Sequence, residues 1–427
     1  MTDLQTVAVV GLGYIGLPTA VAISDRGTRV VGVDVNEATV AAVNAGEAPF
    51  VEPDLAEVLE RAVRAGNLSA TTEVPEADAY IIAVPTPFLA DRTADLSYVR
   101  AAAEAVAPRL RGGEIVILES TSPPGATEQM GRWLLAARPD LAVAGAGDGR
   151  PEVSLAHCPE RVLPGRIMVE LVENDRVIGG LTPACAERAA DVYRTFCEGQ
   201  LFLTDAVTAE LCKLVENSFR DVNIAFANEL AGICDHLGVD VWRLIELANR
   251  HPRVNILKPG PGVGGHCIAV DPWFIVAAAP DRSHLIRQAR EINDARPEQV
   301  VAKALATLPA EGPVTVAALG LAFKADIDDL RESPALHVAE RLADELGERG
   351  TVLAVEPHVE ALPRSLANRR NVRLVDLDTA LADAQSFVLL VDHSAFAAVD
   401  TARLGERPVV DTRGQWRHLV DAAGTPA

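Results

Sequence analysis

A single cysteine follows a glycine-rich run in the second half of the chain. The run reads Lys-Pro-Gly-Pro-Gly-Val-Gly-Gly over residues 258–265, and Cys267 comes two positions later. A thiol that directly follows flexible glycines at a loop-to-helix junction is suited to chemistry, because backbone N–H groups and a helix N-terminus stabilise a thiolate. The alternative is a buried cysteine that only fills space. Asp271, four residues further on, is a candidate acid, base or orienting group.

A polar stripe on a predicted helix favours the chemical interpretation of this cysteine. Apolar residues recur at helical spacing over residues 207–237, and Lys213, Asn217 and Arg220 fall at i, i+4 and i+7, hence on one face. On a helix rich in Leu, Val and Phe, such a stripe is either solvated surface or the lining of a site. The stripe therefore shifts the balance from a space-filling Cys267 towards one with a chemical role.

A second chemical signal lies close to the N-terminus. Gly11, Gly13 and Gly16 form the pattern G-x-G-x-x-G between the first predicted strand and a helix. These glycines permit a tight turn and let the backbone approach a pyrophosphate at the helix N-terminus. Asp34 ends the second predicted strand, where a carboxylate accepts hydrogen bonds from an adenosine ribose. The pair predicts NAD, since the 2′-phosphate of NADP would meet the negative charge of Asp34.

Two further loops end strands of the same predicted sheet. One is Val-Pro-Thr-Pro over residues 84–87, and the other is Ser-Thr-Ser-Pro-Pro-Gly over residues 120–125. Parallel sheets bind ligands beyond the carboxyl ends of their strands. Thr86 and Thr121 are therefore candidates to contact the cofactor or the reacting atoms, although either residue could equally serve the turn itself.

Basic residues recur in loops, which matters because the chain carries a formal net charge of −21. This charge repels nucleic acid and anionic membranes, and a site for an anionic nucleotide must concentrate its own cations. Lys324 and Arg331 follow the first predicted strand of a second α/β unit, and Arg413 follows its last. These are positions at the ligand-binding edge of a sheet, so we interpret the three residues as a diphosphate site rather than as scattered surface charge. Arg253 and Lys258 are further loop cations.

The elements that must position these residues alternate between short apolar runs and amphipathic stretches, as in parallel sheets covered by helices. The predicted strands are residues 7–10, 30–34, 79–84, 114–119 and 153–156, and then 314–320, 352–355, 387–391 and 409–411. Between the two sets we predict a long helix to 237, a break at Gly238, a helix through 249, and another helical stretch to about 308. The predicted fold is α/β, with two Rossmann-like doubly wound domains joined by a central helical segment. The predicted domains are 1–205, 206–308 and 309–427.

Composition excludes several other classes of protein. The chain has 427 residues, 49% of them hydrophobic, and no apolar run approaches the ~18 residues of a membrane span. A strand pattern starts at Val7 and leaves no room for a signal peptide, so we expect a cytoplasmic protein. Six cysteines without a C-x-x-C pair argue against disulfides and a zinc site, and we expect no metal. Four of them are interpreted as small buried hydrophobes: Cys185, Cys197, Cys212 and Cys234.

Taken together, these residues resemble the UDP-glucose/GDP-mannose dehydrogenase family over nearly the whole chain. The matching motifs are the Gly11–Gly16 loop, residues 84–87 and 120–125, Cys-Pro-Glu-Arg at 158–161, Lys213-x3-Asn217, Gly-Gly-His-Cys at 264–267 with Asp271, and Phe-Lys at 323–324 with Arg331. One departure is Glu-Pro at 356–357, where the family usually has Asp-Pro, and we expect it to be harmless.

The resemblance implies a four-electron oxidation of a sugar C6 alcohol to a carboxylate with two NAD⁺. Cys267 would attack the intermediate aldehyde to give a thiohemiacetal and later a thioester, which water would hydrolyse. Lys213 would be the general acid/base and oxyanion partner, and Asn217 would donate to the same oxyanion. Glu160, Thr121 and Asp271 would help to position the water or the thiol.

The resemblance also implies the binding residues. The substrate positions are Glu160, Arg161, Val162, Lys213, Asn217, Arg220, His251, Arg253 and Gly264, with Lys324 and Arg413 near the diphosphate. The NAD positions are Gly11, Gly13, Tyr14, Ile15, Gly16, Asp34, Thr86, Thr121 and Arg331.

Three further motifs resemble the branch of the family that oxidises UDP-N-acetyl-D-mannosamine. They are residues 218–229, 251–257 and 266–273. UDP-N-acetylglucosamine, UDP-glucose and GDP-mannose remain alternative substrates, and a silent nucleotide-sugar or NAD-binding scaffold remains an alternative class. The intact Lys213, Asn217, Cys267 and Asp271 argue against a scaffold.

We also expect a homodimer through the long helix at 207–237, whose apolar residues exceed what one small domain covers. In the family, the arginine that matches Arg253 reaches the active site of the partner subunit.

Overall fold

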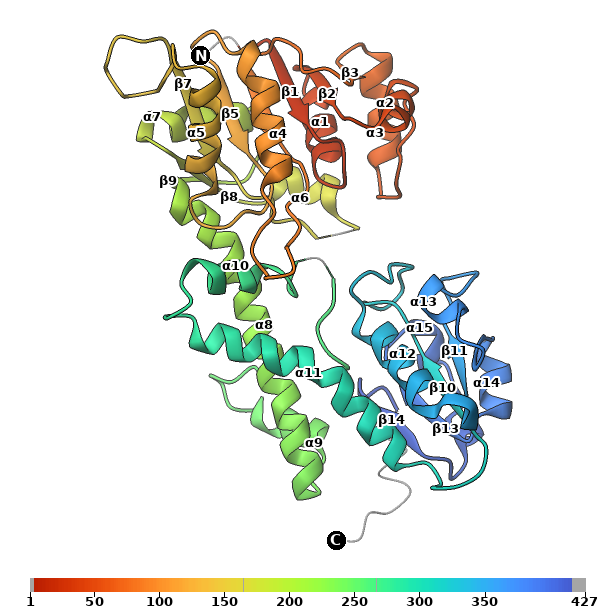
Figure 1. Cartoon of the computed structure of the whole chain (residues 1–427). Helices are drawn as coiled ribbons and strands as arrows, with labels where there is room; N and C mark the ends of the chain where they lie inside the picture. The colour runs from red at the N-terminus through yellow and green to blue at the C-terminus, as the bar shows by residue number, and fades with distance from the viewer. Residues whose placement is uncertain (1–3, 164, 266, 417–427) are drawn as a thin grey trace. The chain divides into compact units, whose positions relative to one another are not determined.

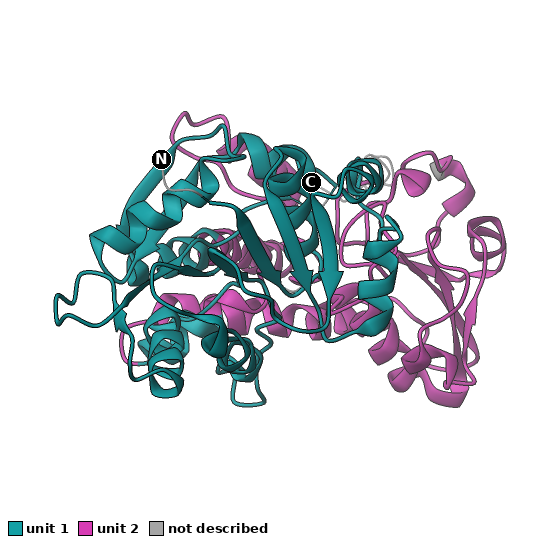
Figure 2. Cartoon of the chain, turned by 90° about the horizontal axis from the view of Figure 1, so that it is seen from above, with its two compact units in different colours: residues 1–216, 273–280 teal, residues 217–272, 281–427 magenta. Residues whose placement is uncertain are grey.

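The computed structural model describes residues 4–163, 165–265 and 267–416. The chain divides into two compact units (Figure 2). The first comprises residues 1–216 and 273–280, and the second comprises residues 217–272 and 281–427. Each unit contains one α/β sheet, and the helical segment in the middle of the chain contributes to both.

The first unit is built on a mostly parallel sheet in which β1 (Thr6–Val10) lies between β2 and β4. Every strand pair is parallel except β7 with β8. In sheet order the strands are β3 (Leu68–Thr71), β2 (Arg29–Val33), β1, β4 (Ala79–Ile82), β5 (Ile115–Leu118), β7 (Glu152–His157), β8 (Arg176–Gly180) and β9 (Leu201–Asp205), with β6 (Ala142–Val143) beside β7. All five strands predicted for this part of the chain are confirmed, within two residues at each end.

Helices cover both faces of this sheet, because alternate residues of β1 enter different cores (Figure 1). Val7 and Val9 pack in one core, and Ala8 and Val10 pack in the other. The first core is closed by α1 (Gly16–Asp25), α2 (Glu37–Asn44), α3 (Leu55–Arg64), α6 (Ile167–Glu173) and α7 (Pro183–Tyr193). The second is closed by α4 (Ser97–Val106), the 3₁₀ turn η1 (Ala107–Arg109) and α5 (Ala126–Ala137). Burial on both faces explains the unbroken apolar runs of these strands.

The sequence did not predict β3, β6, β8 and β9. Strand β9 exposes most of its residues and β6 has only two, so neither shows the apolar run of a central strand. These strands form through pairing with a neighbour rather than through a local pattern.

The central segment is helical, as predicted. Helix α8 (Ala206–Leu237) ends where Gly238 takes a left-handed φ of 68°, which only glycine adopts without strain. Helix α9 (Val241–Ala248) follows, with the Asp240 carboxylate accepting a hydrogen bond from the Arg243 backbone N–H. The next predicted helical stretch is divided in two: α10 (Asp271–Ala278) and α11 (His284–Ala306). Pro280 separates them, because proline disfavours a helix at the preceding residue.

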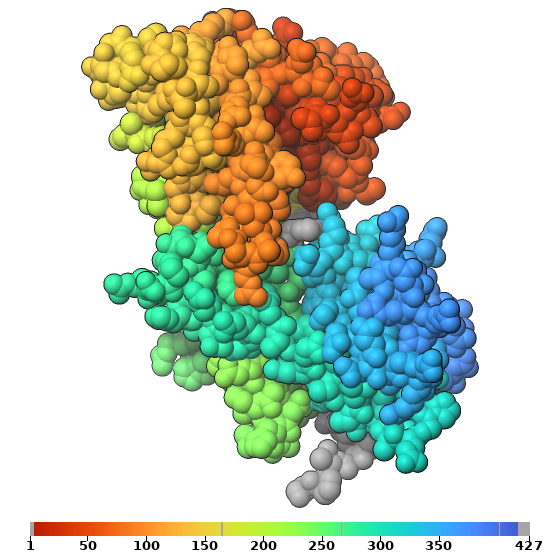
Figure 3. All heavy atoms as spheres, viewed as in Figure 1, coloured from red at the N-terminus to blue at the C-terminus, as the bar shows by residue number. Residues whose placement is uncertain are grey.

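Large apolar side chains remain exposed along α8 and just after it. They are Val207, Val215, Phe219, Phe226, Ile233, Leu237 and Val239. The exposed fraction reaches 70% for Phe219 and 66% for Leu237. The space-filling view shows the end of α8 and helix α9 at the surface, in light green (Figure 3).

The second unit contains a smaller sheet, parallel throughout. In sheet order its strands are β12 (Val372–Leu374), β11 (Gly350–Val355), β10 (Val314–Leu319), β13 (Ser386–Leu389) and β14 (Val409–Asp411). The four predicted strands are confirmed, and β12 was not predicted. One face is covered by α11, α12 (Pro334–Leu346) and α13 (Arg364–Ala367), with η2 (Gly347–Arg349) after α12; the other is covered by α14 (Leu377–Asp383), α15 (Ser394–Ala397) and η3 (Thr401–Leu404).

These two doubly wound sheets with a helical segment between them in sequence confirm the predicted fold class. Within the described residues, no helix is long and apolar enough to cross a membrane.

Candidate active site

The glycine loop after β1 has two glycines that the fold itself requires. Gly11 has a φ of 95°, and a Cβ there would lie 2.6 Å from the carbonyl oxygen of Ala83. A Cβ on Gly16 would lie 1.9 Å from the carbonyl oxygen of Gly11. Around Gly13, in contrast, no atom lies within 4 Å of the Cβ position. The loop therefore leaves open backbone at Gly13, as a bound pyrophosphate needs, and the residues present fit NAD.

Asp34 follows β2 and organises this loop. Its Oδ2 accepts a hydrogen bond of 2.8 Å from the Leu12 backbone N–H, and its Oδ1 accepts one of 2.9 Å from Asn36. The carboxylate is half-buried and has further lone pairs for a ribose hydroxyl. The location fits the predicted ribose contact, which stays a prediction.

Tyr14 lies in the same loop. Its hydroxyl donates to Glu52 at 3.0 Å, and its ring packs against Phe50. Glu52 also accepts hydrogen bonds from the backbone of Gly165 and Ile167. Glu52 thus joins the cofactor loop to the segment after residue 161, a connection that the sequence analysis missed.

The loops after β4 and β5 are bound to each other. The Thr86 hydroxyl donates to the Thr121 carbonyl oxygen at 2.5 Å, and the Ser120 hydroxyl donates to the Val84 carbonyl oxygen at 2.6 Å. Since β4 and β5 are neighbours in the sheet, both threonines lie at its carboxyl edge, as expected. Thr86 therefore has a structural role in addition to any contact with a ligand.

Glu210 on α8 was missed by the sequence analysis. Its carboxylate accepts hydrogen bonds from the backbone N–H of Gly125 at 2.5 Å, and from both the backbone N–H and the hydroxyl of Thr127. Burial raises the pKa of Glu210, although these hydrogen bonds oppose the shift. A carboxylate at the N-terminus of α5 is favoured by the helix dipole. Glu210 consequently fixes α8, one turn before Lys213, against the end of the Thr121 loop.

Glu160 is buried beside a buried cation. Its Oε2 lies 3.0 Å from Nη1 of Arg176, and its Oε1 accepts from the Arg161 backbone N–H at 2.7 Å. The Arg161 side chain binds Glu216 of α8 at 2.6 Å. The loop after β7 is thus attached to α8, as the loop after β5 is through Glu210.

A second buried carboxyl group, Glu119, lies next to Glu160 and was also missed. Burial, followed by the charge of Glu160, raises the pKa of Glu119 to about 8, while Arg176 opposes the shift. The hydroxyls of Thr19 and Tyr193 lie 3.1 and 3.2 Å from its two oxygens. One cation therefore faces two carboxyl groups, and Glu119 is the one that holds a proton at neutral pH.

Cys267 is exposed and lies in a turn that leads into α10. Its carbonyl oxygen accepts hydrogen bonds from the backbone N–H of Val270 and Asp271. The neighbouring His266 lies outside the described residues. The predicted loop-to-helix junction is confirmed.

The glycines before Cys267 are required by close packing, which the sequence did not predict. A Cβ on Gly264 would lie 2.5 Å from the Glu332 carbonyl oxygen and 2.6 Å from Pro334. Gly265, at φ 83°, packs against the ring of Phe323. The loop before Cys267 therefore rests directly on the loop that follows β10.

The structure joins Asn217 to Asp271. The Asn217 Nδ2 donates to Asp271 Oδ2 at 2.6 Å, and the carboxylate is buried. Lys213 lies one turn earlier on α8 and is half-buried, whereas Arg220 is exposed. The polar stripe is thus bonded to the residue that begins α10, four positions after the thiol.

Several other predicted site residues, and the loop cation Lys258, are not brought together by contacts among the described residues. His251, Arg253 and Lys258 are exposed in the loop after α9, where the His251 Nδ1 accepts from the Arg253 backbone N–H. Val162 is half-buried after β7, and Ile15 precedes α1.

The predicted diphosphate residues lie in loops of the second sheet, as expected. Lys324 is exposed. Arg331 is also exposed, and its guanidinium pairs with Asp329. Arg413 pairs with Asp392, and its Nη1 lies 2.8 Å from the Cβ position of Gly260, against the glycine-rich loop.

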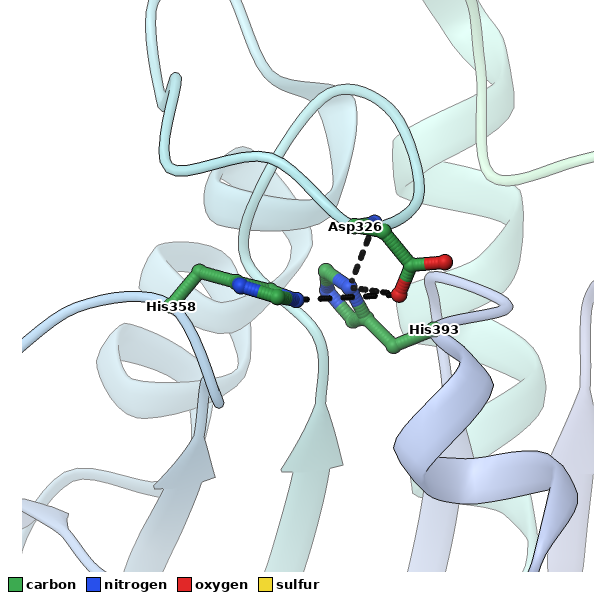
Figure 4. A group of neighbouring side chains, drawn as sticks. All are labelled: Asp326, His358 and His393. Carbon is green, nitrogen blue, oxygen red and sulfur yellow. Dashed lines mark hydrogen bonds and ion pairs between the residues drawn. The ribbon is translucent and has the colours of Figure 1, made fainter.

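Asp326, His358 and His393 cluster at the carboxyl edge of the second sheet (Figure 4). His393 Nδ1 accepts from the Asp326 backbone N–H at 3.0 Å, and its Nε2 lies 3.1 Å from the Glu356 carboxylate. Both nitrogens of this ring are engaged. A metal ion could bind His393 only by displacing one of these hydrogen bonds, so the cluster as arranged offers two ligand side chains.

Three consecutive parts of the chain match models of one protein family. Residues 5–197 match the NAD binding domain of the UDP-glucose/GDP-mannose dehydrogenase family, residues 207–295 match its central domain, and residues 317–418 match its UDP binding domain.

Individual relatives cover almost the whole chain. The NDP-N-acetyl-D-galactosaminuronic acid dehydrogenase of Ralstonia nicotianae is 55% identical over 97% of both chains. The UDP-N-acetyl-D-mannosamine dehydrogenase of Escherichia coli K12 is 54% identical over 97% of this chain and all of its own. The structure of a UDP-N-acetyl-mannosamine dehydrogenase from Staphylococcus aureus superposes with a TM-score of 0.82 at 42% identity, covering 95% of this chain and 94% of that one.

Proposed function

The chain belongs to the UDP-glucose/GDP-mannose dehydrogenase family, and from that premise we propose that it oxidises the C6 alcohol of UDP-N-acetyl-D-mannosamine to the carboxylate. It is an NAD-dependent enzyme, as its family and its relatives are. The hydrogen bond between Asn217 and Asp271 supports the proposal most directly, because it binds the polar face of α8 to the turn of Cys267. A scaffold protein would have no need of this arrangement.

NAD would be held by the loops at the carboxyl edge of the first sheet. The open backbone at Gly13 would face the pyrophosphate, and Asp34 would accept from the ribose. Tyr14, Ile15, Thr86, Thr121 and Arg331 complete the proposed set. When bound, NAD⁺ supplies the hydride acceptor for each of the two oxidations.

Cys267 would carry the intermediate. Once C6 is an aldehyde, the thiolate adds to its carbon, and the resulting thiohemiacetal still bears the hydrogen that the second oxidation removes. The product of that oxidation is a thioester. Water adds to it, the C–S bond breaks, and the thiolate leaves with the electron pair. Its exposed position lets Cys267 reach a substrate carbon.

Lys213 would take the proton from the C6 hydroxyl, and its ammonium would then stabilise the oxyanion of the tetrahedral intermediate. Asn217 uses one amide hydrogen for Asp271 and keeps a second for the same oxyanion. Asp271 would orient Asn217 and the turn of Cys267. Asn217 and Asp271 are thus fixed relative to each other before substrate binds.

Glu160 and Thr121 would position the hydrolytic water. The ion pair with Arg176 keeps the Glu160 carboxylate in one orientation, and the protonated Glu119 beside it adds no second negative charge. The Glu160 carboxylate would then accept a hydrogen bond from that water.

The nucleotide sugar would be bound by cations from several loops. Lys324 and Arg413 would contact the diphosphate, because both lie in loops at the carboxyl edge of the second sheet. The remaining proposed contacts are Arg161, Val162, Arg220, His251, Arg253 and Gly264. We propose the division 1–205, 206–308 and 309–427 for the NAD-binding, central and UDP-binding domains.

We further propose a cytoplasmic homodimer that associates through α8. The exposed side chains of Phe219, Phe226 and Leu237 would be covered in such a dimer. A single copy of the chain leaves this apolar surface in water.

A second candidate substrate is UDP-N-acetyl-D-galactosamine, which the name of the Ralstonia relative favours. The two sugars differ in configuration, and pocket shape reads such a difference with only ~1–3 kcal/mol. UDP-N-acetylglucosamine, UDP-glucose and GDP-mannose are the further alternatives.

NADH absorbance with these five nucleotide sugars tests the proposal. We expect the highest kcat/KM with UDP-N-acetyl-D-mannosamine, and two NADH for each uronic acid found by mass spectrometry. A higher kcat/KM with another sugar would reassign the substrate. No NADH with any of the five would leave the scaffold as the remaining interpretation.

A further inference from the structure

We propose that His393 is a positioning residue: together with Glu356 it holds the loop after β10, which carries Lys324 and supports the glycines before Cys267. The inference rests on the proposed function, because it concerns the same nucleotide-sugar site. It adds two residues that neither the sequence analysis nor the family motifs assigned to that site.

Glu356 lies at the end of β11 and holds the start of the loop. Its Oε2 accepts hydrogen bonds from the backbone N–H of Leu321 at 2.7 Å and of Ala322 at 3.0 Å. The side chain is buried, and these bonds and that of His393 keep its pKa below the ordinary value although burial opposes them. Glu356 is therefore an ionised acceptor that replaces water for two backbone donors.

His393 follows β13 and joins Glu356 to the far end of the same loop segment. Its side chain is fully buried, with Nε2 beside Glu356 and Nδ1 accepting from the Asp326 backbone N–H. Because a backbone N–H can only donate, Nδ1 must carry the lone pair and Nε2 the proton. One neutral ring thus links a strand end to the loop through both of its nitrogens.

The backbone at Asp326 needs such support. Its φ of 59° is left-handed, a conformation that non-glycine residues rarely adopt. The backbone N–H and the hydroxyl of Ser394 both donate to Asp326 Oδ1 at 2.9 Å. Figure 4 shows the Asp326 carboxylate beside the rings of His393 and His358. His393 and Ser394 together hold this residue from the end of β13.

The segment held in this way, residues 321–326, connects the two functions of the loop. Lys324 lies within it, and the Phe323 ring packs on Gly265. The Cβ of Phe323 also lies 3.1 Å from the Cβ position of Gly264. A displacement of this segment would therefore move a proposed diphosphate contact and the support of the Cys267 turn together.

Loss of the His393 link should affect the binding of the nucleotide sugar more than the binding of NAD⁺. Most of the proposed NAD contacts, among them Gly13, Asp34, Thr86 and Thr121, belong to loops of the first sheet. Arg331 lies in the loop after β10, but five residues beyond the held segment 321–326. Loss of the His393 link should therefore weaken nucleotide binding much more than it raises the KM for NAD⁺. A general loss of stability, in contrast, would affect the binding of the nucleotide sugar and of NAD⁺ alike.

Three substitutions at position 393 separate the two hydrogen bonds. His393→Asn keeps an oxygen close to the place of Nδ1, so it can accept from Asp326 but cannot reach Glu356. His393→Gln can reach Glu356 but leaves the Asp326 N–H without its acceptor. His393→Phe removes both bonds and keeps a ring. His337→Phe is the control, since His337 is an exposed residue of α12.

Calorimetric titration with UDP measures nucleotide binding without turnover, and steady-state assays give both KM values. We expect the dissociation constant for UDP to rise about tenfold in the Phe and Gln variants, and to stay within about threefold in the Asn variant. The KM for NAD⁺ should change less than about twofold in all of them. Equal UDP affinity in the Phe variant and the wild type, or equal loss in the Asn and Phe variants, would overturn the proposal.

Ser394→Ala keeps the proposal testable if the Phe variant does not fold, because this exposed hydroxyl contacts Asp326 alone among the described residues. It should weaken UDP binding about threefold, and an unchanged affinity would count against the proposal. Failure of the proposed function is recognised separately. In that case the wild-type protein produces no NADH with any nucleotide sugar, whatever its affinity for UDP.

Discussion

The side chain of Asn217, in the middle of the 32-residue helix α8, donates a 2.6 Å hydrogen bond to the buried carboxylate of Asp271, the first residue of α10. Cys267 lies one helical turn before Asp271 in the sequence. The helix that carries Lys213 and the turn that carries the thiol are therefore coupled through this hydrogen bond. Several predictions about catalysis depend on this coupling or on the loops attached to the same helix.

Cys267→Ala should abolish formation of the uronic acid, because no covalent adduct can form for the second oxidation. Cys267→Ser should be nearly as inactive, with kcat lower by roughly a hundredfold or more, since an alkoxide is much harder to generate than a thiolate. The measurement is NADH production together with product analysis by mass spectrometry. The control is Cys234→Ala, which changes a buried cysteine of helix α8. Two NADH and a carboxylate from Cys267→Ala at near wild-type rate would make Cys267 structural.

Asp34→Ala should relax the preference for NAD⁺ over NADP⁺, because the negative charge that meets the 2′-phosphate is removed. The KM for NAD⁺ should rise as well, by about tenfold, since Asp34 also accepts from the Leu12 backbone N–H. The ratio of kcat/KM values with the two cofactors is the quantity to measure. Equal efficiency with both cofactors in the unmodified enzyme would contradict the assignment of Asp34.

Arg253 tests the dimer, because the family resemblance places it in the active site of the partner subunit. Arg253→Ala and Lys213→Ala homodimers should each be nearly inactive. Mixed after dissociation, they should regain up to about a quarter of the wild-type activity, since half of a random population is hybrid and each hybrid has one intact site. Sedimentation velocity establishes the oligomeric state in parallel. A fully active monomer would disprove this arrangement.

Glu210→Ala should lower kcat about tenfold or more and leave the chemistry of Cys267 itself intact. The substitution removes three hydrogen bonds that fix α8 to the end of the Thr121 loop, so Lys213 loses its fixed position. Loss of this carboxylate cap should also cost about 1 kcal/mol of stability. Glu128→Ala, which removes an exposed acid from the first turn of α5, is the matched control. Equal kcat values for the two variants would assign Glu210 a role in stability alone.

Glu119 should make stability depend on pH. Its pKa is raised from 4.5 in the unfolded chain to about 8 in the folded protein by burial and then by the charge of Glu160. The folded state therefore binds more protons than the unfolded state between these values, and the free energy of unfolding falls as pH rises from about 4.5 to about 8.

Glu119→Gln keeps the shape of a protonated carboxyl group and removes its titration. The variant should show a smaller fall in melting temperature between pH 6 and pH 8 than the wild type. Glu128→Gln is the exposed control. Identical pH profiles for the Glu119 variant and the wild type would show that this carboxyl group does not titrate in the range.

The sequence by itself was sufficient for the elements whose signals are local. The glycines before α1, the apolar runs of β1 and β10, and the helical periodicity of α8 predicted both sheets and the helical segment between them. Each of these patterns records a short-range requirement, such as a positive φ at Gly11 or burial of both faces of a strand. The same holds for Cys267, whose position before a helix could be predicted from its neighbours.

The tertiary structure decided what those residues contact. Glu210 resembles any acidic residue on a helix surface until β5 and α5 bring Gly125 to it, and β9 becomes a strand only beside β8. In the sequence, Gly264 suggested a flexible loop. In the structure, the place where a side chain would begin is occupied by Glu332 and Pro334. The physical reason is that desolvation and steric contact depend on groups far away in the chain. The carboxyl group of Glu119 holds a proton because it is buried and because Glu160 lies beside it, and no local pattern records either relationship.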